Sequence, residues 1–206
     1  MTVLVQPINC TLKAGDAPSS TDAMIAVLRS AFENTGAAVA DTLRIANYDI
    51  KPGETSDEGD GDQWPTVREA ILEADVLVLG GPIWMGQPSS VCKRVLERMD
   101  AFLYEKDERD RMPSYGRLGL VAVVGNEDGA HHVSAELFQG LNDVGFTLPP
   151  NAVTYWVGEA MGDKDYKDFK TSPKVTTYAT TLMVAGAAHL AGLLKRTPYP
   201  GLEKKK

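Results

Sequence analysis

The chain is poor in cysteine, and its two cysteines lie far apart in the sequence. Cys10 and Cys92 form no Cys-x-x-Cys pair and have no zinc-ligand spacing. This pattern argues against a redox dithiol motif and against a structural zinc site. We expect two reduced, partly buried thiols with no catalytic role.

Histidine is also scarce, with three residues in a chain of 206. His131 and His132 are adjacent, and adjacent residues in the first turn of a helix do not face the same way. No third ligand is spaced to join them, so we expect no metal site. His189 lies in an alanine-rich stretch and is expected to be a buried or interface histidine.

Two nucleotide-binding motifs are missing after the first predicted strand. The sequence has neither the Gly-x-Gly-x-x-Gly fingerprint nor a Gly-x-x-x-x-Gly-Lys-Ser/Thr loop there. The first absence argues against a dinucleotide fold of that type, and the second against an ATPase phosphate loop. A methyltransferase-like Rossmann fold is disfavoured as well, because it needs a glycine-rich first loop.

Positive charge is not in excess. The chain has 21 Lys and Arg against 28 Asp and Glu, a net charge of −7. Because Lys and Arg supply most phosphate contacts, this balance argues against nucleic acid or an anionic membrane as the main partner. We find no signal-peptide pattern and no run of about 20 apolar residues, and we expect a cytoplasmic protein.

Short apolar runs and helical stretches alternate along the chain. A hydrophobic content of 43% is enough for one domain spanning residues 1–206, with a basic tail from about residue 196. The predicted strands are residues 3–8, 39–45, 76–79, 118–124 and 153–157, and the predicted helices are residues 21–35, 65–73, 89–102, 130–144 and 174–194. This alternation predicts an α/β fold with a parallel sheet covered on both faces.

Three connecting segments stand out by length or charge. Residues 54–62 carry five acidic residues and no base, which is typical of a solvated loop. Residues 105–114 form a charged connection, expected to be an extended helix end and a loop, and residues 158–173 are longer than a typical loop. Both are interpreted as surface insertions or oligomer contacts.

Ligands of open parallel sheets bind beyond the carboxyl ends of the strands, at the switch in strand order. The loops after the first, third and fourth predicted strands are therefore the candidates. The first loop, residues 9–20, leads hydroxyl residues into a helix N-terminus, where amides and the helix dipole favour a phosphate. Simple helix capping by Ser19, Ser20, Thr21 or Asp22 explains the same pattern.

The loop after the third strand reads "GGPIWMGQPSSV", from residue 80 to residue 91. Gly80, Gly81 and Gly86 allow the backbone to approach a flat ligand closely. Trp84 and Met85 offer apolar, polarizable surface for a ring system. The alternative is that these two side chains cap the core or an oligomer interface.

The loop after the fourth strand, residues 125–132, is polar and bracketed by glycines. Asn126 and exposed amides in it could hydrogen-bond to the edge of a heteroaromatic ring. The alternative is a strand-to-helix turn capped by Asp128. Taken together, the three loops offer a phosphate cradle, an apolar face and a polar edge, which are the three parts of a flavin mononucleotide (FMN).

The stretches "GGPIWMGQPSSVCKRVLERMD" and "VVGNEDGAHHV", after a hydroxyl-rich first loop, resemble the flavodoxin-like superfamily. Within it, the chain is most similar to NAD(P)H-dependent FMN reductases and to quinone reductases of the tryptophan-repressor-binding-protein type. The resemblance covers residues 3 to about 194. It implies a three-layer sandwich with a five-stranded parallel sheet in the order 2-1-3-4-5, FMN as cofactor and NADH or NADPH as electron donor.

The resemblance also implies the site residues. Those expected at the phosphate are Thr11, Lys13, Ser19, Ser20 and Thr21; those at the isoalloxazine ring are Pro82, Ile83, Trp84, Met85 and Gly86; those at its other edge are Gly125, Asn126, Glu127, Asp128 and Gly129, with His131 as a further candidate. Trp84 is expected to form a wall of the acceptor pocket. The first loop is longer than in flavodoxins and contains Asp16, whose carboxylate would repel a phosphate if it pointed inward.

The implied activity is hydride transfer from NAD(P)H through flavin N5 to a quinone or similar small acceptor. The flavin carries this chemistry, so no catalytic side chain is required. The resemblance further implies a homodimer or homotetramer. Two alternatives remain open: a flavodoxin-type electron-transfer protein, which the acidic charge fits but the chain length does not, and a flavin-free binding module of the same fold.

Overall fold

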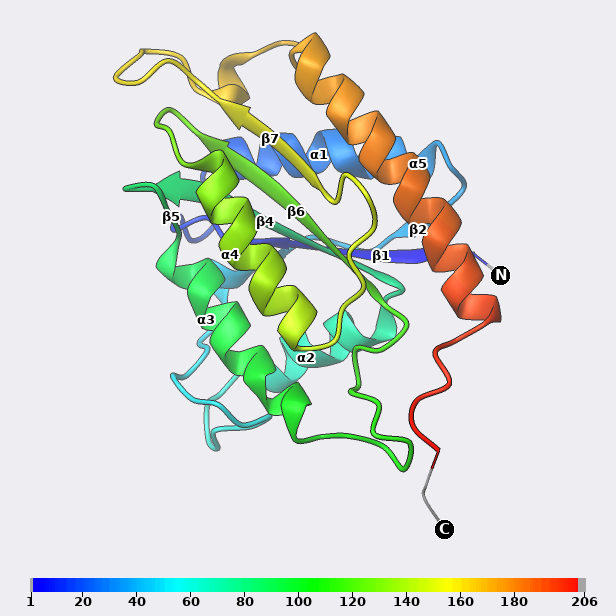
Figure 1. The fold of residues 1–206 in the computed structure, drawn as a ribbon. Helices are drawn as coiled ribbons and strands as arrows, with labels where there is room; N and C mark the ends of the chain where they lie inside the picture. Colours follow the sequence, from blue (N-terminus) through cyan, green and yellow to red (C-terminus); the bar gives the residue numbers. More distant parts are fainter. Residues whose placement is uncertain (1, 204–206) are drawn as a thin grey trace.

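A parallel β-sheet lies between two layers of helices in the computed structural model, which describes residues 2–203 (Figure 1). Across the sheet the strands follow in the order β2 (Ala38–Val39), β1 (Leu4–Asn9), β4 (Val76–Trp84), β6 (Leu118–Gly125) and β7 (Val153–Val157). Every neighbouring pair in this path is parallel. The predicted α/β architecture and the predicted strand order are confirmed.

Five helices cover the sheet. α1 (Ser20–Glu33) and α5 (Lys174–Arg196) pack on one face, and α2 (Trp64–Glu73), α3 (Ser90–Met99) and α4 (Ala130–Asp143) pack on the other. Ser89 caps α3 as predicted, because its Oγ accepts a hydrogen bond from the Cys92 amide at 3.1 Å. The helix expected to reach Phe102 ends at Met99 and continues as the 3-10 helix η2 (Asp100–Leu103).

The second predicted strand, residues 39–45, was wrong as one continuous element. Two short strands replace it: β2 pairs with the start of β1, and β3 (Leu43–Arg44) pairs with its end before the 3-10 helix η1 (Ile45–Asn47). Between them the Asp41 carbonyl accepts a hydrogen bond from the Gln6 side chain at 2.9 Å. A side-chain contact therefore takes the place of a ladder bond at this point.

The third predicted strand is much longer than its apolar run. Beyond Leu79, β4 continues through Gly80, Gly81 and Pro82, which pair with β6, and it ends in a hairpin with the antiparallel strand β5 (Gln87–Pro88). A Cβ on Gly80 would lie 3.0 Å from the Ile25 side chain, and one on Gly81 would lie 3.5 Å from Cys92 Sγ. Gly80 therefore makes room for the Ile25 side chain, whereas a Cβ on Gly81 would make only ordinary contact, and neither glycine lines the cavity described below.

Cys10 and Cys92 are fully buried, not partly buried, and they are unpaired. Their side chains are in hydrogen-bonding contact, and burial, together with the neighbouring Cys92, raises the pKa of the Cys10 thiol. The pair lies in the core behind β4 and does not line the cavity described below. His189, expected to be buried or at an interface, is exposed on α5.

The longest helix, α5, is apolar and long enough to cross a membrane by length and composition alone, with a mean hydropathy of 1.3 over an 18-residue window. The sequence analysis did not anticipate this. A core helix passes the same test, and α5 packs one face against the sheet through Met183, Val184 and Ala187. Beyond α5, the tail turns back along the loop before β6, where the Leu202 amide donates to the Arg109 carbonyl at 2.8 Å. The basic residues 204–206 of the predicted tail lie outside the described residues.

Candidate functional site

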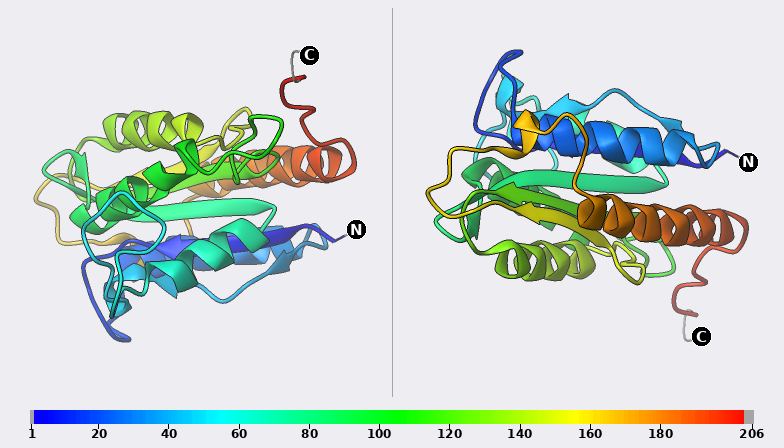
Figure 2. Two further views of the ribbon diagram at one scale, coloured as in Figure 1. Left: turned by 90° about the horizontal axis from the view of Figure 1, so that it is seen from below. Right: turned by 90° about the horizontal axis from the view of Figure 1, so that it is seen from above.

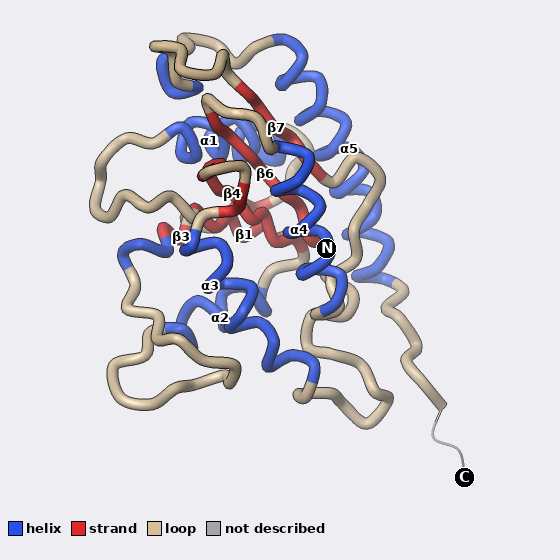
Figure 3. The backbone as a smooth tube through the Cα atoms, turned by 60° about the vertical axis from the view of Figure 1, so that its left-hand side comes forward, coloured by secondary structure: helices blue, strands red, loops and turns tan. Residues whose placement is uncertain are grey.

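Four loops meet at the carboxyl edge of the sheet, on the left of Figure 1 and turned toward the viewer in Figure 3. They follow β1, β4, β6 and β7 and enclose a cavity of about 550 Å³, which lies in the range usual for small-molecule sites. The lining residues are Thr11, Leu12, Lys13, Ser19, Ser20, Thr21, Pro82, Ile83, Trp84, Val124, Gly125, Asn126, Glu127, Ala160, Met161, Gly162 and Asp165. All five residues expected at the phosphate are among them.

One end of the cavity is the N-terminus of α1. Ser19 is the N-cap: its Oγ accepts from the Asp22 amide at 3.1 Å and donates to the Asp22 carboxylate at 2.7 Å. The amides of Ser20 and Thr21, in the first turn, have no carbonyl partner within the helix. Capping and anion binding therefore coexist here, because the cap uses the Ser19 side chain and leaves first-turn amides at the positive end of the dipole.

Arg44 on β3 fixes the first loop from outside. Its guanidinium donates to the carbonyls of Lys13 at 3.3 Å and Ala17 at 2.9 Å, and it pairs with the Asp22 carboxylate at 2.5 Å. Asp16 is exposed and does not line the cavity. The carboxylate that raised a doubt about phosphate binding is therefore outside the cavity.

The middle of the cavity is apolar. Pro82, Ile83 and Trp84 line it from the last residues of β4, so this wall belongs to a strand and not to a loop. Met85 and Gly86 form the tight turn into β5 with φ values of 50° and 73°, as a two-residue hairpin turn of the primed type requires. These two predicted ring contacts do not line the cavity.

The loop after β6 supplies the third side. Gly125, Asn126 and Glu127 line the cavity, whereas Asp128 and Gly129 do not. Gly129 is itself the N-cap of α4, so capping by the Asp128 side chain is not observed. Glu127 Oε1 accepts from the Met85 amide at 2.8 Å, which ties this loop to the β4–β5 hairpin.

The histidines lie beside the cavity and not in its lining. His131 Nε2 is 3.1 Å from the hydroxyl of Tyr155, and the two rings meet edge to face. His132 Nε2 lies 2.8 Å from the Glu136 carboxylate and 2.9 Å from Gln87 Nε2. Within residues 2–203, no group of three or more His, Cys, Asp and Glu side chains is arranged to hold a metal ion.

The fourth side was missed by the sequence analysis. Ala160, Met161, Gly162 and Asp165, from the long loop after β7, line the same cavity. Asn126 Nδ2 donates to Asp165 Oδ1 at 2.7 Å. The sequence could have predicted this side of the cavity, because the loop follows the fifth strand and all parallel strands end at one edge. The prediction considered only the loops nearest the switch in strand order.

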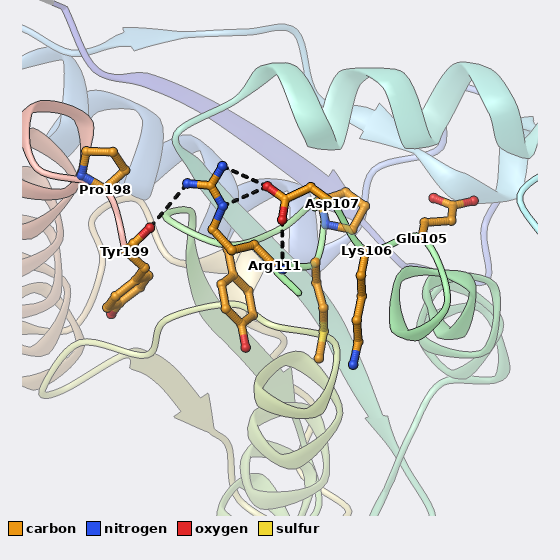
Figure 4. Close-up of a pocket in the computed structure, with 9 residues that line it drawn as sticks. Glu105, Lys106, Asp107, Arg111, Pro198 and Tyr199 are labelled. Atoms are coloured by element: carbon orange, nitrogen blue, oxygen red, sulfur yellow. Dashed lines mark hydrogen bonds and ion pairs between the residues drawn. The ribbon is translucent and has the colours of Figure 1, made fainter. Parts of the chain in front are cut away.

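A second pocket, of about 440 Å³, lies at the opposite edge of the sheet (Figure 4). The loop before β6 and the C-terminal tail line it. Arg111 pairs with Asp107 at 2.7 Å and donates to the Tyr199 carbonyl at 3.2 Å. No residue predicted for ligand binding lines this pocket, so the carboxyl-edge cavity is the candidate site.

Comparison with known proteins identifies the family. The chain matches the family model of NADPH-dependent FMN reductases over residues 3–161. It is 31% identical over 202 residues to the 8-demethyl-8-aminoriboflavin-5′-phosphate synthase of Streptomyces davaonensis, covering 93% of this chain and 78% of that protein. The solved structure of RosB with the bound intermediate 8-demethyl-8-formylriboflavin-5′-phosphate is similar with a TM-score of 0.87 and 30% identity, over 96% of this chain and 82% of that one.

A further relative is named for a different activity. The divalent metal cation transporter MntH of Mycobacterium bovis is 36% identical over 195 residues, or 91% of this chain. The chain spans only 28% of that protein. The family match covers more than half of the chain, and the similarity to the synthase extends across nearly all of it; the fold is flavodoxin-like, and the chain belongs to the NADPH-dependent FMN reductase family.

Proposed function

We propose that the protein is an FMN-dependent oxidoreductase that takes a hydride from NADH or NADPH and passes the electrons to a quinone or a similar flat acceptor. The observation that carries the proposal is the three-part lining of the carboxyl-edge cavity. A hydroxyl-rich helix N-terminus, an apolar wall and an amide edge follow one another in it. When bound, FMN supplies the two-electron chemistry between donor and acceptor.

The residues present fit riboflavin 5′-phosphate. Lys13 and the first turn of α1 at Ser20 and Thr21 would hold the phosphate. Pro82 and Trp84 would contact the ring, and Asn126 would meet its polar edge. The chain's task is to bind and orient the flavin and to keep water from its inner face, since β4 and β6 are buried directly behind the wall.

The mouth of the cavity supports a flat apolar acceptor. Leu12, Trp84 and Met161 are 45%, 48% and 98% exposed, and they come from the loop after β1, the end of β4 and the loop after β7. Exposed apolar side chains gathered at a cleft are typical of binding surfaces. Aromatic and thioether groups suit stacking with a nicotinamide or a quinone ring.

We extend the proposal to assembly and location: a homodimer or homotetramer acting in the cytoplasm, with no nucleic-acid or membrane partner. In support, α5 exposes Val175, Tyr178 and Leu182, which are spaced to form one apolar stripe. Sedimentation at several protein concentrations tests the assembly. A monomer at every concentration would contradict it.

Similarity to the synthase favours a second candidate function, in which FMN is the substrate and is chemically altered. That similarity extends across nearly the whole chain, and the related RosB structure holds a modified riboflavin 5′-phosphate. Both candidate functions require the same flavin phosphate in the same cavity. They differ in whether the flavin leaves unchanged.

The first experiment is the visible spectrum of the purified protein, with titration of FMN followed by tryptophan fluorescence. Bound oxidised flavin or quenching supports the site, and a colourless protein that ignores FMN favours the flavin-free binding module. The second experiment follows NADPH consumption with benzoquinone as acceptor and then the mass of the recovered flavin. Steady NADPH consumption with unchanged FMN supports the reductase, and a changed flavin mass supports the second candidate. If FMN binds but neither NADPH consumption nor a changed flavin mass is seen, the result favours an electron-transfer flavodoxin.

A further inference from the structure

The loop after β7 reaches the phosphate end of the cavity. Its 3-10 helix η3 (Tyr166–Asp168) packs against α1, and Figure 2 shows it over the first turn of that helix. The Lys167 amide donates to Ser20 Oγ at 3.4 Å. Ser20 is one of the residues expected at the phosphate, so this contact brings Lys167 to the same place from the other end of the chain.

The ammonium of Lys167 pairs with Asp165, which is a residue of the cavity lining. One oxygen of the Asp165 carboxylate accepts from Asn126, and the other pairs with Lys167 Nζ. Asp165 lines the cavity, and the side chains of Lys167 and Asp165 are 30% and 40% exposed. Lys167 does not itself line the cavity, but its ion pair holds the cation beside Asp165, and its partial exposure leaves it open to an incoming anion.

The side chains that line the cavity carry little positive charge, so a further cation would favour phosphate binding. The lining contains the carboxylates of Glu127 and Asp165 and a single cationic side chain, Lys13. A phosphate monoester brings up to about two negative charges at neutral pH. The phosphate would be met by helix amides and by one lysine, with the Asp165 carboxylate nearby. A second lysine would supply the positive charge that this end of the cavity lacks.

We infer that Lys167, positioned by Asp165, binds the phosphate of the flavin and makes the site prefer riboflavin 5′-phosphate to riboflavin. The inference rests on the proposed flavin site and adds a residue to it. It also assigns a function to the long loop after β7, which closes the cavity over the phosphate end. Neutral flavins that lack the phosphate gain nothing from this lysine.

The test compares two ligands that differ only in the phosphate. Dissociation constants of FMN and riboflavin are measured by flavin fluorescence for the protein freed of bound flavin and for Lys167→Met. We expect FMN to bind about five- to tenfold more weakly to Lys167→Met, because a partly exposed charge-assisted contact is lost. The dissociation constant of riboflavin should stay unchanged.

Two variants serve as matched controls. Lys170→Met removes the same charge from the same loop; Lys170, like Lys167, is exposed and outside the cavity lining, but only Lys167 contacts Ser20 and Asp165. It should leave both dissociation constants unchanged. Lys167→Arg keeps the cation and should retain most of the preference for FMN.

The outcomes separate this inference from the proposed function. Equal weakening of FMN and riboflavin in Lys167→Met would assign Lys167 a structural role in the loop and overturn the inference. No change in either ligand, or the same loss of FMN affinity in Lys170→Met, would overturn it as well. If the unmodified protein binds neither flavin, the proposed function fails and this inference fails with it.

Discussion

Replacing Arg98 by methionine breaks the most deeply buried ion pair of the protein's described part. Arg98 on α3 lies 2.8 Å from the Asp62 carboxylate, and neither side chain is exposed. Its guanidinium also donates to the carbonyls of Lys51 at 2.9 Å and Thr55 at 2.8 Å. The acidic segment 54–62, expected to be a solvated loop, is therefore anchored at Asp62 by a buried cation on α3.

The expected loss in the free energy of unfolding follows from the interactions that Asp62 loses when Arg98 is removed. Removing one member of a buried ion pair typically lowers the free energy of unfolding by about 3–5 kcal/mol, because the other charge stays buried without its partner. Burial alone raises the pKa of Asp62, but hydrogen bonds from the amides of Glu58 and Trp64, together with Arg98, lower it to about 2. Relative to an unfolded aspartate near 3.9, that depression amounts to roughly 2–3 kcal/mol of stability at neutral pH.

The sign of the pH dependence is fixed by that depressed pKa. The contribution of Asp62 is present above about pH 4 and is lost as the pH falls toward the folded value near 2. In Arg98→Met the folded pKa of Asp62 is higher, so less stability remains to be lost in acid. The difference between the wild-type protein and Arg98→Met should therefore shrink between pH 4 and pH 2.

Urea denaturation at pH 7 and pH 3, followed by tryptophan fluorescence, measures both effects. Arg94→Met is the control on the same helix, because Arg94 donates to the Ile50 carbonyl at 2.9 Å but meets Glu97 only at 3.8 Å, and both charged side chains are partly exposed. Its loss should be at most about 2 kcal/mol, below the loss for a buried pair. The reasoning is refuted if Arg98→Met costs no more than Arg94→Met, or if its effect is the same at both pH values.

Three further changes probe the cavity. In Gly129→Ala, a Cβ would lie 2.8 Å from Gly86 Cα, so FMN binding should weaken by about tenfold in a fluorescence titration. Gly116→Ala is the control, since Gly116 also has a positive φ but nothing within 4 Å; equal loss in both would contradict the contact argument. Ser19→Ala removes the N-cap and should lower the free energy of unfolding by about 1 kcal/mol in urea denaturation; an unchanged value would show that the cap is redundant. Trp84→Ala should raise the KM for benzoquinone more than the dissociation constant of FMN, and an unchanged KM would remove Trp84 from the acceptor pocket.

The fold was predictable from the sequence where a run of apolar residues marks a strand or a helix. Residues 153–157 were located to the residue, and the alternation predicted the parallel sheet, whereas the order of its five strands was implied by the resemblance to the flavodoxin-like superfamily. The length of β4 was not predictable, because Gly80-Gly81-Pro82 has the composition of a turn. Only the position of Ile25 shows why a residue without a Cβ, Gly80, belongs inside the strand.

The candidate site was predictable to the extent that strand ends determine it. The loops after β1, β4 and β6 meet at one cavity because parallel strands end at the same edge. Which residues of each loop face the cavity was harder to read. Met85 and Gly86 turn away because a two-residue hairpin sets their backbone, and no periodic pattern predicts such a turn. Asp165 joins the site through Asn126, 39 residues away in sequence, and only the tertiary structure shows that contact.

The two candidate functions require different rates of flavin release, and the loop after β7 is the part of the site that would set this rate. A resident cofactor must dissociate slowly, whereas a substrate must leave in every turnover. The apolar wall at Pro82 and Ile83 is built on strands buried behind it and is the same in either case. The phosphate end is instead closed by the 3.4 Å contact between Lys167 and Ser20 and by a partly exposed ion pair. We therefore expect the dissociation rate of FMN to change more in Lys167→Met than in variants of the ring wall. A dissociation much slower than turnover favours the reductase, and one at least as fast as turnover favours flavin as the substrate.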